Sequence, residues 1–268
     1  FLLALKEAGL VPQVVVGTSM GAVVGGLYAA GQDLERLSQV LGALDLRGIF
    51  GVPDSYRRAL ERSIGEALWE RWRGPSWQGE PSPRLARMLE LLRLFGKGLS
   101  IEQLPLRFAA VACDLNSGEE VVITSGPLHL GLAASAALPG VFHPLPWRGR
   151  WLIDGGVVNN LPADVALNLG AQVVVAVDVS APLGDPPRTS VEVILRSYAI
   201  TSQELTRVKL ARAKERLGER LLYVRPQVEG IGVLEFERLF QAKEAGWRAA
   251  QQLIPKLVQL LPPGGSPT

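Results

Sequence analysis

The sequence predicts an α/β fold in which helices flank a central, mainly parallel sheet. Short apolar segments with the length of buried strands alternate along the chain with segments of helical character. Hydrophobic residues make up 47% of the 268 residues and charged residues 20%, so the chain has enough apolar material for a large core. The length fits one large domain, or one domain with an inserted cap.

The first βα unit is the clearest element of this prediction. Residues 14–16 are three valines, and a small-residue helix at 22–30 follows them after a tight glycine turn. Residues 1–8 are predicted to end a helix, and the chain lacks an initial Met, so we expect an upstream segment to be absent and leave an upstream targeting signal open. The other strands are predicted at 108–113, 120–124, 151–153, 173–178 and 221–225, and the other helices at 128–137, 162–169 and 191–217.

Residues from about 45 to 105 are predicted to form a helical cap-like insertion. Apolar side chains recur there at helical spacing in two segments, joined by a Pro/Gly/Trp stretch at 74–83. Its tryptophans and arginines permit two interpretations: a core-facing stripe with a solvated basic face, or peripheral contact with an anionic membrane. They are Trp69, Trp72, Trp77, Arg71, Arg73, Arg84, Arg87 and Arg93. We expect a single domain over 1–261 and a disordered tail over 262–268.

The composition excludes several classes of function. With 28 Lys and Arg against 26 Asp and Glu, the net charge is +2, which argues against nucleic acid as a partner. One cysteine, Cys113, allows no intrachain disulfide, and two histidines beside it are too few for a usual zinc site. We therefore expect neither a metal nor a cofactor. No apolar run reaches the roughly 18 residues of a membrane-spanning helix, and we expect a cytoplasmic protein.

A motif of two glycines around a serine follows the first predicted strand directly. Gly17, Ser19 and Gly21 have the spacing of a nucleophile elbow, in which a sharp strand-to-helix turn exposes the serine hydroxyl. The start of the following helix then directs free N–H groups, such as that of Met20, at charge developing near the hydroxyl. The alternative is a tight turn in which the serine only caps the helix.

A nucleophilic serine needs a base, and Asp154 is the better candidate. It ends the short apolar strand at 151–153, and Gly155 and Gly156 allow close approach to another loop. Two alternatives stay open: Asp154 as a simple turn residue, and a triad of Ser19 with Asp114 and either His129 or His143. Both histidines stand in sequence contexts that favour structural roles.

Separate blocks of the chain resemble a known family in the same order. Residues 15–22 and 25–29 are similar to the nucleophile block of bacterial patatin-like phospholipases. Residues 133–142 resemble the block that precedes the catalytic acid of that family, and residues 154–162 resemble the acid block itself. Residues 112–115 and 118–119 resemble a further core segment, so that the resemblance extends from residue 1 to about 180.

The resemblance implies a three-layer patatin-like fold and a lipid acyl hydrolase of the phospholipase A or esterase type. Ser19 is then the acylated nucleophile and Asp154 its base, without a catalytic histidine. Gly17, Met20, Gly21, Gly155 and Gly156 support the pair. The implied substrate is a lipid or another acyl ester, and the resemblance implies no cofactor.

One part of the family pattern has no counterpart in the sequence. The family carries a glycine-rich loop with a basic residue before its first helix, and the N–H groups of this loop form the oxyanion hole. This chain begins inside the corresponding helix. The alternative function is therefore a catalytically impaired domain that binds lipid or regulates, without a complete oxyanion hole. The sequence makes no prediction of the oligomeric state.

Overall fold

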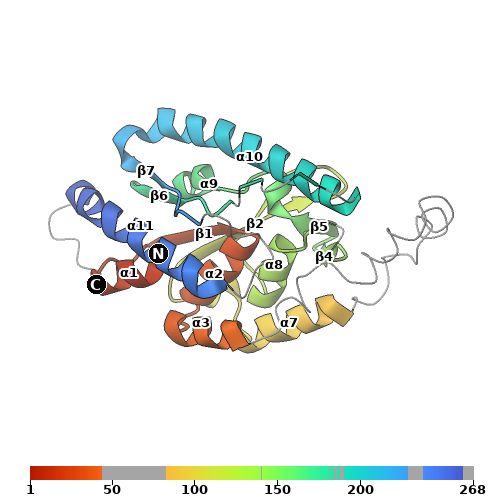
Figure 1. Cartoon of the computed structure of the whole chain (residues 1–268). Helices are drawn as coiled ribbons and strands as arrows, with labels where there is room; N and C mark the ends of the chain where they lie inside the picture. The colour runs from red at the N-terminus through yellow and green to blue at the C-terminus, as the bar shows by residue number, and fades with distance from the viewer. Residues whose placement is uncertain are drawn as a thin grey trace.

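In the part of the chain that the structure describes, seven strands form two sheets. The computed structural model describes residues 1–43, 83–139, 141–180, 182–183, 186–187, 190–228 and 238–261. A five-stranded sheet contains β1 (Val14–Thr18), β2 (Arg107–Asp114), β3 (Glu120–Ile123), β4 (Leu145–Trp147) and β5 (Arg150–Asp154). β6 (Val174–Val177) and β7 (Leu221–Val224) form a separate parallel pair (Figure 1).

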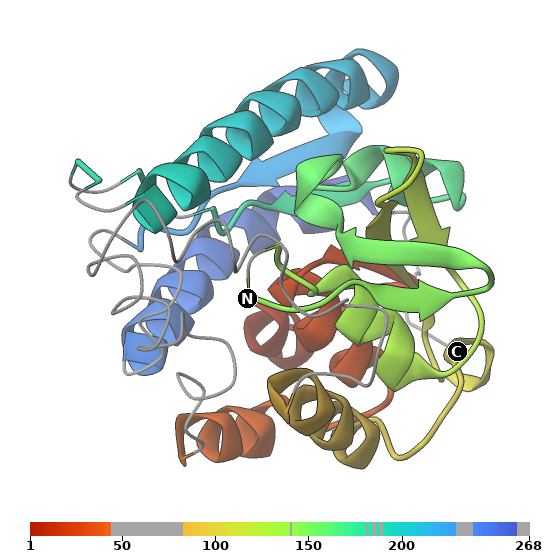
Figure 2. The same ribbon diagram turned by 90° about the vertical axis from the view of Figure 1, so that its right-hand side faces the viewer.

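Helices lie on both faces of the five-stranded sheet, as Figures 1 and 2 show. On one side, α2 and α8 pack against β1 and β2, with α3 and α7 beyond them; on the other side lie α9 and α10. α1 and α11 pack against each other beside β7. The bounds are α1 (Leu2–Glu7), α2 (Met20–Ala29), α3 (Leu34–Ala43), α7 (Pro83–Phe95), α8 (Leu128–Ser135), α9 (Ala163–Asn168), α10 (Ser190–Leu217) and α11 (Leu239–Leu260). The expected three-layer α/β architecture is confirmed.

The five-stranded sheet is mixed, which differs from the expectation of a mainly parallel sheet. β1 runs parallel to β2, but β3 and β5 pair antiparallel with β2, and β4 pairs antiparallel with β5. For the β2–β3 and β4–β5 pairs the cause is a tight connection, which admits only an antiparallel neighbour. The turn 115–119 joins β2 to β3, and Arg148 and Gly149, with φ of 48° and 80°, join β4 to β5. Two successive positive φ values are typical of a type I′ hairpin turn.

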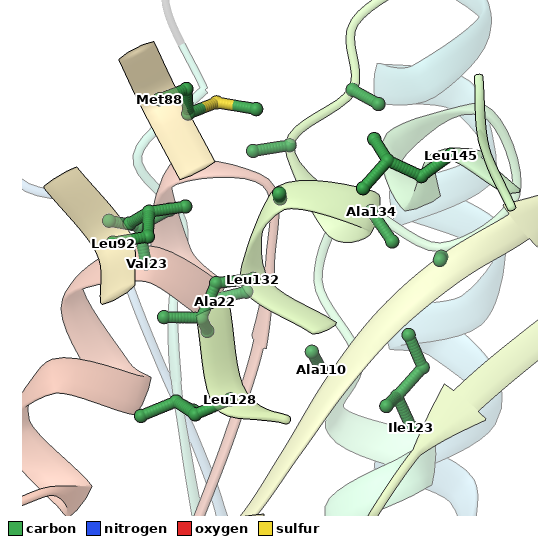
Figure 3. Packing of buried hydrophobic residues seen from close by; sticks show 14 of the residues in the cluster. Ala22, Val23, Met88, Leu92, Ala110, Ile123, Leu128, Leu132, Ala134 and Leu145 are labelled. Carbon is green, nitrogen blue, oxygen red and sulfur yellow. The ribbon is translucent and has the colours of Figure 1, made fainter. Parts of the chain in front are cut away.

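The main core lies between β2 and the helices on the α2 and α8 side. Figure 3 shows Leu128 and Leu132 of α8 close to Ala22 and Val23 of α2, with side chains of α7 beside them. Gly26 of α2 allows the close approach of α8, because a Cβ there would lie 2.6 Å from Leu132 Cδ2. The missing side chain at Gly26 therefore lets α2 and α8 pack closely against each other.

α7 contributes its apolar face to this same core. Leu85, Met88 and Leu92 are 3%, 1% and 4% exposed and belong to the main cluster, whereas Arg87 and Arg93 are exposed. Residues 45–82 of the predicted cap, with Trp69, Trp72 and Trp77, lie outside the described residues, as does the tail 262–268. The cap and the tail therefore stay predictions. Among the helices of the described ranges, none has the length and apolarity needed to span a membrane.

Candidate active site

β1 and β5 run toward each other along one edge of β2. At Ala110, β2 pairs with β3 on one edge and with β1 on the opposite edge. At Ala112, β2 pairs again with β3 on the first edge and with β5 on the opposite edge. β1 and β5 therefore lie on the same edge of β2, one after the other. β1 ends at Thr18 opposite Val111, and β5 ends at Asp154 opposite Ala112. The residue that follows β1 and the last residue of β5 are thus brought together. They are the predicted nucleophile and its predicted base.

Ser19 stands at a strained turn between β1 and α2. Its φ of 55° and ψ of −128° are unusual for a residue with a side chain, and it is the N-cap residue of α2. Gly17 has no side chain at a point where a Cβ would overlap the backbone of Gly21. Gly21 differs, since no described residue comes within 4 Å of a Cβ built there. The elbow therefore needs a glycine at 17 for packing, while a side chain at position 21 would meet none of the described residues.

A buried serine, Ser135, supports the elbow, although its sequence context predicted no such role. The N–H of Ser19 donates to Ser135 Oγ at 3.0 Å, and the Ser135 hydroxyl donates to the carbonyl oxygen of Val111 at 2.5 Å. Ser135 is fully buried at the end of α8. Val111 lies where β2 changes partner from β1 to β5, so Ser135 ties the elbow to the point at which the two strands meet.

Asp154 is buried and surrounded by hydrogen-bond donors. Its side chain is 1% exposed, and Oδ1 accepts from the Gly156 N–H at 2.8 Å and from Tyr198 Oη at 3.3 Å. The Ser19 side chain lies near enough to this carboxyl to lower its pKa. Burial raises the pKa of Asp154, and Ser19 and the hydrogen bonds from Gly156 and Tyr198 oppose this rise. A carboxylate with a raised pKa and a serine hydroxyl as partner is suited to accept the serine proton.

The glycines after Asp154 allow the acid loop to lie against the sheet. A Cβ at Gly155 would overlap the carbonyl oxygen of Val111, and one at Gly156 would overlap Tyr198 Oη. The same loop is fastened to the elbow because Thr18 Oγ1 donates to the Asn159 carbonyl oxygen at 2.7 Å. The two glycines were expected to allow close approach to another loop; the elements that they approach are strand β2 at Gly155 and helix α10 at Gly156.

Neither histidine belongs to the contacts of Ser19 and Asp154 among the described residues. The Nδ1 atoms of His129 and His143 are buried and without a partner there, and burial lowers the pKa of His129. Asp114 instead accepts from the Asn116 N–H at 3.1 Å and from Ser117 Oγ at 3.1 Å. It shapes the turn after β2, and the alternative triad is not assembled in this part of the structure.

Beyond the acid lies a polar cluster that sequence reasoning also missed. Asn159 Nδ2 donates to Glu120 Oε2 and to Asp164 Oδ1, both at 2.9 Å. Lys209 of α10 forms ion pairs with the same two carboxylates. This cluster joins β3, α9 and α10 around the acid loop. In the described ranges, no three His, Cys, Asp or Glu side chains are grouped to hold a metal ion.

Comparison with known proteins identifies the family. The family model for patatin-like phospholipases matches residues 1–167, more than half of the chain. The chain belongs to the patatin-like phospholipase family. Ser19, Ser135 and Asp154 all lie within the matched range.

Curated relatives of this patatin-like chain are considerably longer. A patatin-like phospholipase domain-containing protein of Caenorhabditis elegans is 29% identical over 96% of this chain and 19% of its own length. An uncharacterised NTE family protein of Mycobacterium tuberculosis is 34% identical over 69% of this chain and 46% of its own length. Lysophospholipase NTE1 of Pyricularia oryzae is 26% identical over 95% of this chain and 17% of its own length. The chain thus spans less than half the length of these relatives.

Among solved structures, VipD from Legionella pneumophila is similar with a TM-score of 0.45 and 15% sequence identity. The similarity covers 95% of this chain and 63% of that one.

Proposed function

We propose that the chain is a lipid acyl hydrolase of the phospholipase A or esterase type, with Ser19 as the acylated nucleophile and Asp154 as its base. The observation that carries the proposal is the juxtaposition of Ser19, at a strained elbow that directly follows β1, with the buried Asp154 carboxyl at the end of β5 on the same edge of β2. The family membership supports the reaction class. Names of relatives such as lysophospholipase NTE1 support a phospholipid or lysophospholipid acyl ester as substrate.

Acylation begins with attack of Ser19 Oγ on the ester carbonyl carbon. A bond forms between Oγ and this carbon, and the hydroxyl proton passes to Asp154. The tetrahedral intermediate collapses as the bond to the leaving alcohol breaks, and Asp154 returns the proton to the alcohol oxygen. The products of this half-reaction are an acyl-enzyme at Ser19 and a free alcohol.

Deacylation repeats these steps with water as the nucleophile. Asp154 accepts a proton from water while the water oxygen attacks the acyl carbon. The bond between that carbon and Ser19 Oγ then breaks, and the proton returns from Asp154 to Oγ. The products are a free fatty acid and the original enzyme, so atoms and charge balance over the cycle.

The start of α2 offers electrostatic stabilisation for the oxyanion. The first intrahelical bonds run from the N–H groups of Ala22 and Val23 to the Ser19 carbonyl oxygen. The N–H groups of Met20 and Gly21 precede them, and such groups at a helix start remain free to bind an anion. We assign the Met20 N–H as one oxyanion donor.

Hydrolysis of a soluble medium-chain p-nitrophenyl ester tests the proposed function. We expect Ser19→Ala and Asp154→Asn to lose at least about a thousandfold in kcat, because each removes a group that takes part in bond-making. His129→Ala and His143→Ala, checked for folding by circular dichroism, serve as controls and retain activity. A folded His143→Ala protein as inactive as Ser19→Ala would overturn the Ser–Asp mechanism in favour of a triad.

Peripheral contact with a membrane is part of the proposal. Val193 and Ile194 at the start of α10 are 49% and 66% exposed, and Arg196 on the same helix donates to the carbonyl oxygen of Leu183, which is 41% exposed. α10 also carries Tyr198, which contacts Asp154, so these apolar side chains lie on a helix of the site.

Ile194→Glu should reduce sedimentation with phosphatidylglycerol vesicles. Phe240→Glu, at an exposed apolar position on α11, should not. Equal losses in both variants would remove this assignment.

A further inference from the structure

Tyr198 reaches the catalytic acid from a part of the chain that the family match does not include. The matched range ends at residue 167, and Tyr198 lies on α10, which packs over the acid loop (Figure 1). Its Oη donates to Asp154 Oδ1 at 3.3 Å. The side chain is half-buried, so this hydrogen bond is shielded from bulk water.

Gly156, two residues after Asp154 in the acid loop, makes room for this contact. Gly156 donates its N–H to the same oxygen, Asp154 Oδ1, at 2.8 Å. A Cβ at position 156 would overlap Tyr198 Oη and lie 3.1 Å from Asp154 Oδ1. Only a residue without a side chain lets the phenol and the backbone N–H bind one carboxylate oxygen together.

We propose that Tyr198 is a positioning residue for the Ser19–Asp154 pair: its phenol and the Gly156 N–H fix Asp154 Oδ1, and thereby orient the carboxylate toward the Ser19 hydroxyl. This inference rests on the proposed function, because it assigns a role within the same site. It makes α10 a part of the catalytic apparatus.

The electrostatic surroundings keep Tyr198 a donor. Burial and the neighbouring Asp154 charge raise the pKa of Tyr198 well above its ordinary value, so the phenol stays protonated wherever Asp154 is ionised. The influences on the pKa of Asp154 are burial and hydrogen bonds, and no charged side chain of the described residues is among them. The titratable groups on the elements packed around it include Arg107, Cys113 and Asp114 on β2, Arg150 on β5, His129 on α8, and Arg196, Glu204, Arg207 and Lys209 on α10.

Tyr198→Phe tests the role because it keeps the ring and removes only the donor. The rate of Ser19 labelling by a fluorophosphonate is measured from pH 4 to pH 9, together with ester hydrolysis. Because the Tyr198 hydrogen bond lowers the pKa of Asp154, its loss should move the acidic limb of both profiles to higher pH. On the pH plateau, we expect kcat to fall about tenfold to a hundredfold with KM within about twofold.

A second tyrosine–aspartate pair provides a matched control. Tyr223 on β7 donates to Asp178 Oδ2 at 2.8 Å, outside the Ser19–Asp154 contacts. Tyr223→Phe removes an equivalent hydrogen bond and should leave the pH profile and kcat unchanged. If Tyr198→Phe matches the wild type in kcat and in its acidic limb, the inference is wrong while the proposed function stands. A wild-type protein that shows no labelling and no hydrolysis removes both.

Gly156→Ala tests the placement of the phenol. The added methyl group should displace Tyr198 and reduce kcat more than Tyr198→Phe does, since the overlap is with Oη. In the Tyr198→Phe background the same substitution has lost that overlap and keeps only the 3.1 Å contacts with Asn160 Oδ1 and Asp154 Oδ1, so its further effect should be smaller and the two changes non-additive. An equal loss from Gly156→Ala in both backgrounds would overturn the proposed contact.

If Tyr198→Phe folds poorly, the same hydrogen bond can be tested in the wild-type sequence by changing the acidity of its tyrosines. Biosynthetic replacement of the four tyrosines by 3-fluorotyrosine makes each phenol a stronger donor. The acidic limb should then move to lower pH, opposite to the shift in Tyr198→Phe, whereas 3-fluorotyrosine replacement in Tyr223→Phe should give the same downward shift. An unmoved limb in the fluorinated wild type would contradict the role of Tyr198.

Discussion

Asp154 is placed where its negative charge is unfavourable for folding and useful for chemistry. The side chain is 1% exposed, and burial outweighs Ser19 and the hydrogen bonds from Gly156 and Tyr198 in setting its pKa above the ordinary value. The protonated carboxyl is therefore the form that the fold prefers. The ionised form, which the proposed mechanism needs, is present only when the pH is above this raised pKa.

This conflict predicts that Asp154→Asn is more stable than the wild type at high pH. A carboxyl whose pKa is raised on folding contributes stability that is present below the unfolded pKa of about 3.9 and lost as the pH rises through the folded value. Asparagine keeps the shape without a charge. In urea unfolding from pH 4 to pH 9, the difference in unfolding free energy should grow with pH in favour of the variant. A difference that grows in favour of the wild type would show that the hydrogen bonds outweigh burial.

The residues that sequence reasoning found are those with a local signature. Ser19 and Gly17 are recognisable because one strand-to-helix turn fixes their geometry, and Asp154 because it ends a strand before two glycines. Ser135 and Tyr198 have no such signature. Their roles depend on which backbone group or carboxylate lies opposite in space, and a serine or tyrosine inside a helix looks the same with or without such a partner.

At the scale of elements, α8 supports the elbow through one side chain. Ser135 accepts from the Ser19 N–H and donates to the Val111 carbonyl oxygen, so a single hydroxyl satisfies two backbone groups. Both groups lie where the partner of β2 changes from β1 to β5. At such a change the regular hydrogen-bond ladder of the sheet is interrupted, and the two groups find their partner in Ser135 instead. α8 is therefore joined to the site by hydrogen bonds as well as by apolar packing.

Ser135→Ala should lower both stability and activity. Two backbone groups would lose their partner inside the protein, which costs about 1–3 kcal/mol of unfolding free energy. Release of the Ser19 N–H should also reduce kcat, because the strained elbow loses its support. Urea unfolding and ester hydrolysis measure the two effects.

Ser202→Ala on α10 is the matched control for that prediction. Ser202 is 4% exposed, but its hydroxyl has no hydrogen-bond partner among the described residues. Its removal should leave stability unchanged or raise it, since an unpaired buried polar atom is lost and alanine favours a helix. Equal destabilisation in the two variants would show that Ser135 acts only through packing.

The prediction of elements succeeded where the hydrophobic period was uninterrupted. β1, β2, β3, β6 and β7 are apolar runs and lie at the predicted places, each with bounds within one or two residues. β4 was not predicted, because its three residues include Pro146 and are too short to show alternation. The antiparallel pairing was not predicted either. It depends on the turn at Arg148 and Gly149, and arginine is an uncommon residue at positive φ.

At the scale of the whole molecule, the site is assembled from segments that are distant in sequence. Ser19, Ser135, Asp154 and Tyr198 come from β1–α2, α8, β5 and α10. α9 and α10 pack with β6 and β7 in a second apolar cluster that includes Leu161, Val174, Ala213 and Leu221. α10, which lies beyond the residues that the family model matches, thus covers the acid loop and belongs to the same folded domain.

Covalent labelling tests the central claim, a histidine-independent Ser19–Asp154 pair, most directly. The protein is treated with a fluorophosphonate, and the modified residue is located by mass spectrometry of proteolytic fragments. The account predicts one adduct at Ser19, with the proton passing to Asp154 as fluoride leaves. Labelling should be lost in Ser19→Ala, slowed by at least about a hundredfold in Asp154→Asn, and unchanged in the folded His129→Ala/His143→Ala double variant. An adduct on another serine, or loss of labelling in the double histidine variant alone, would contradict the account.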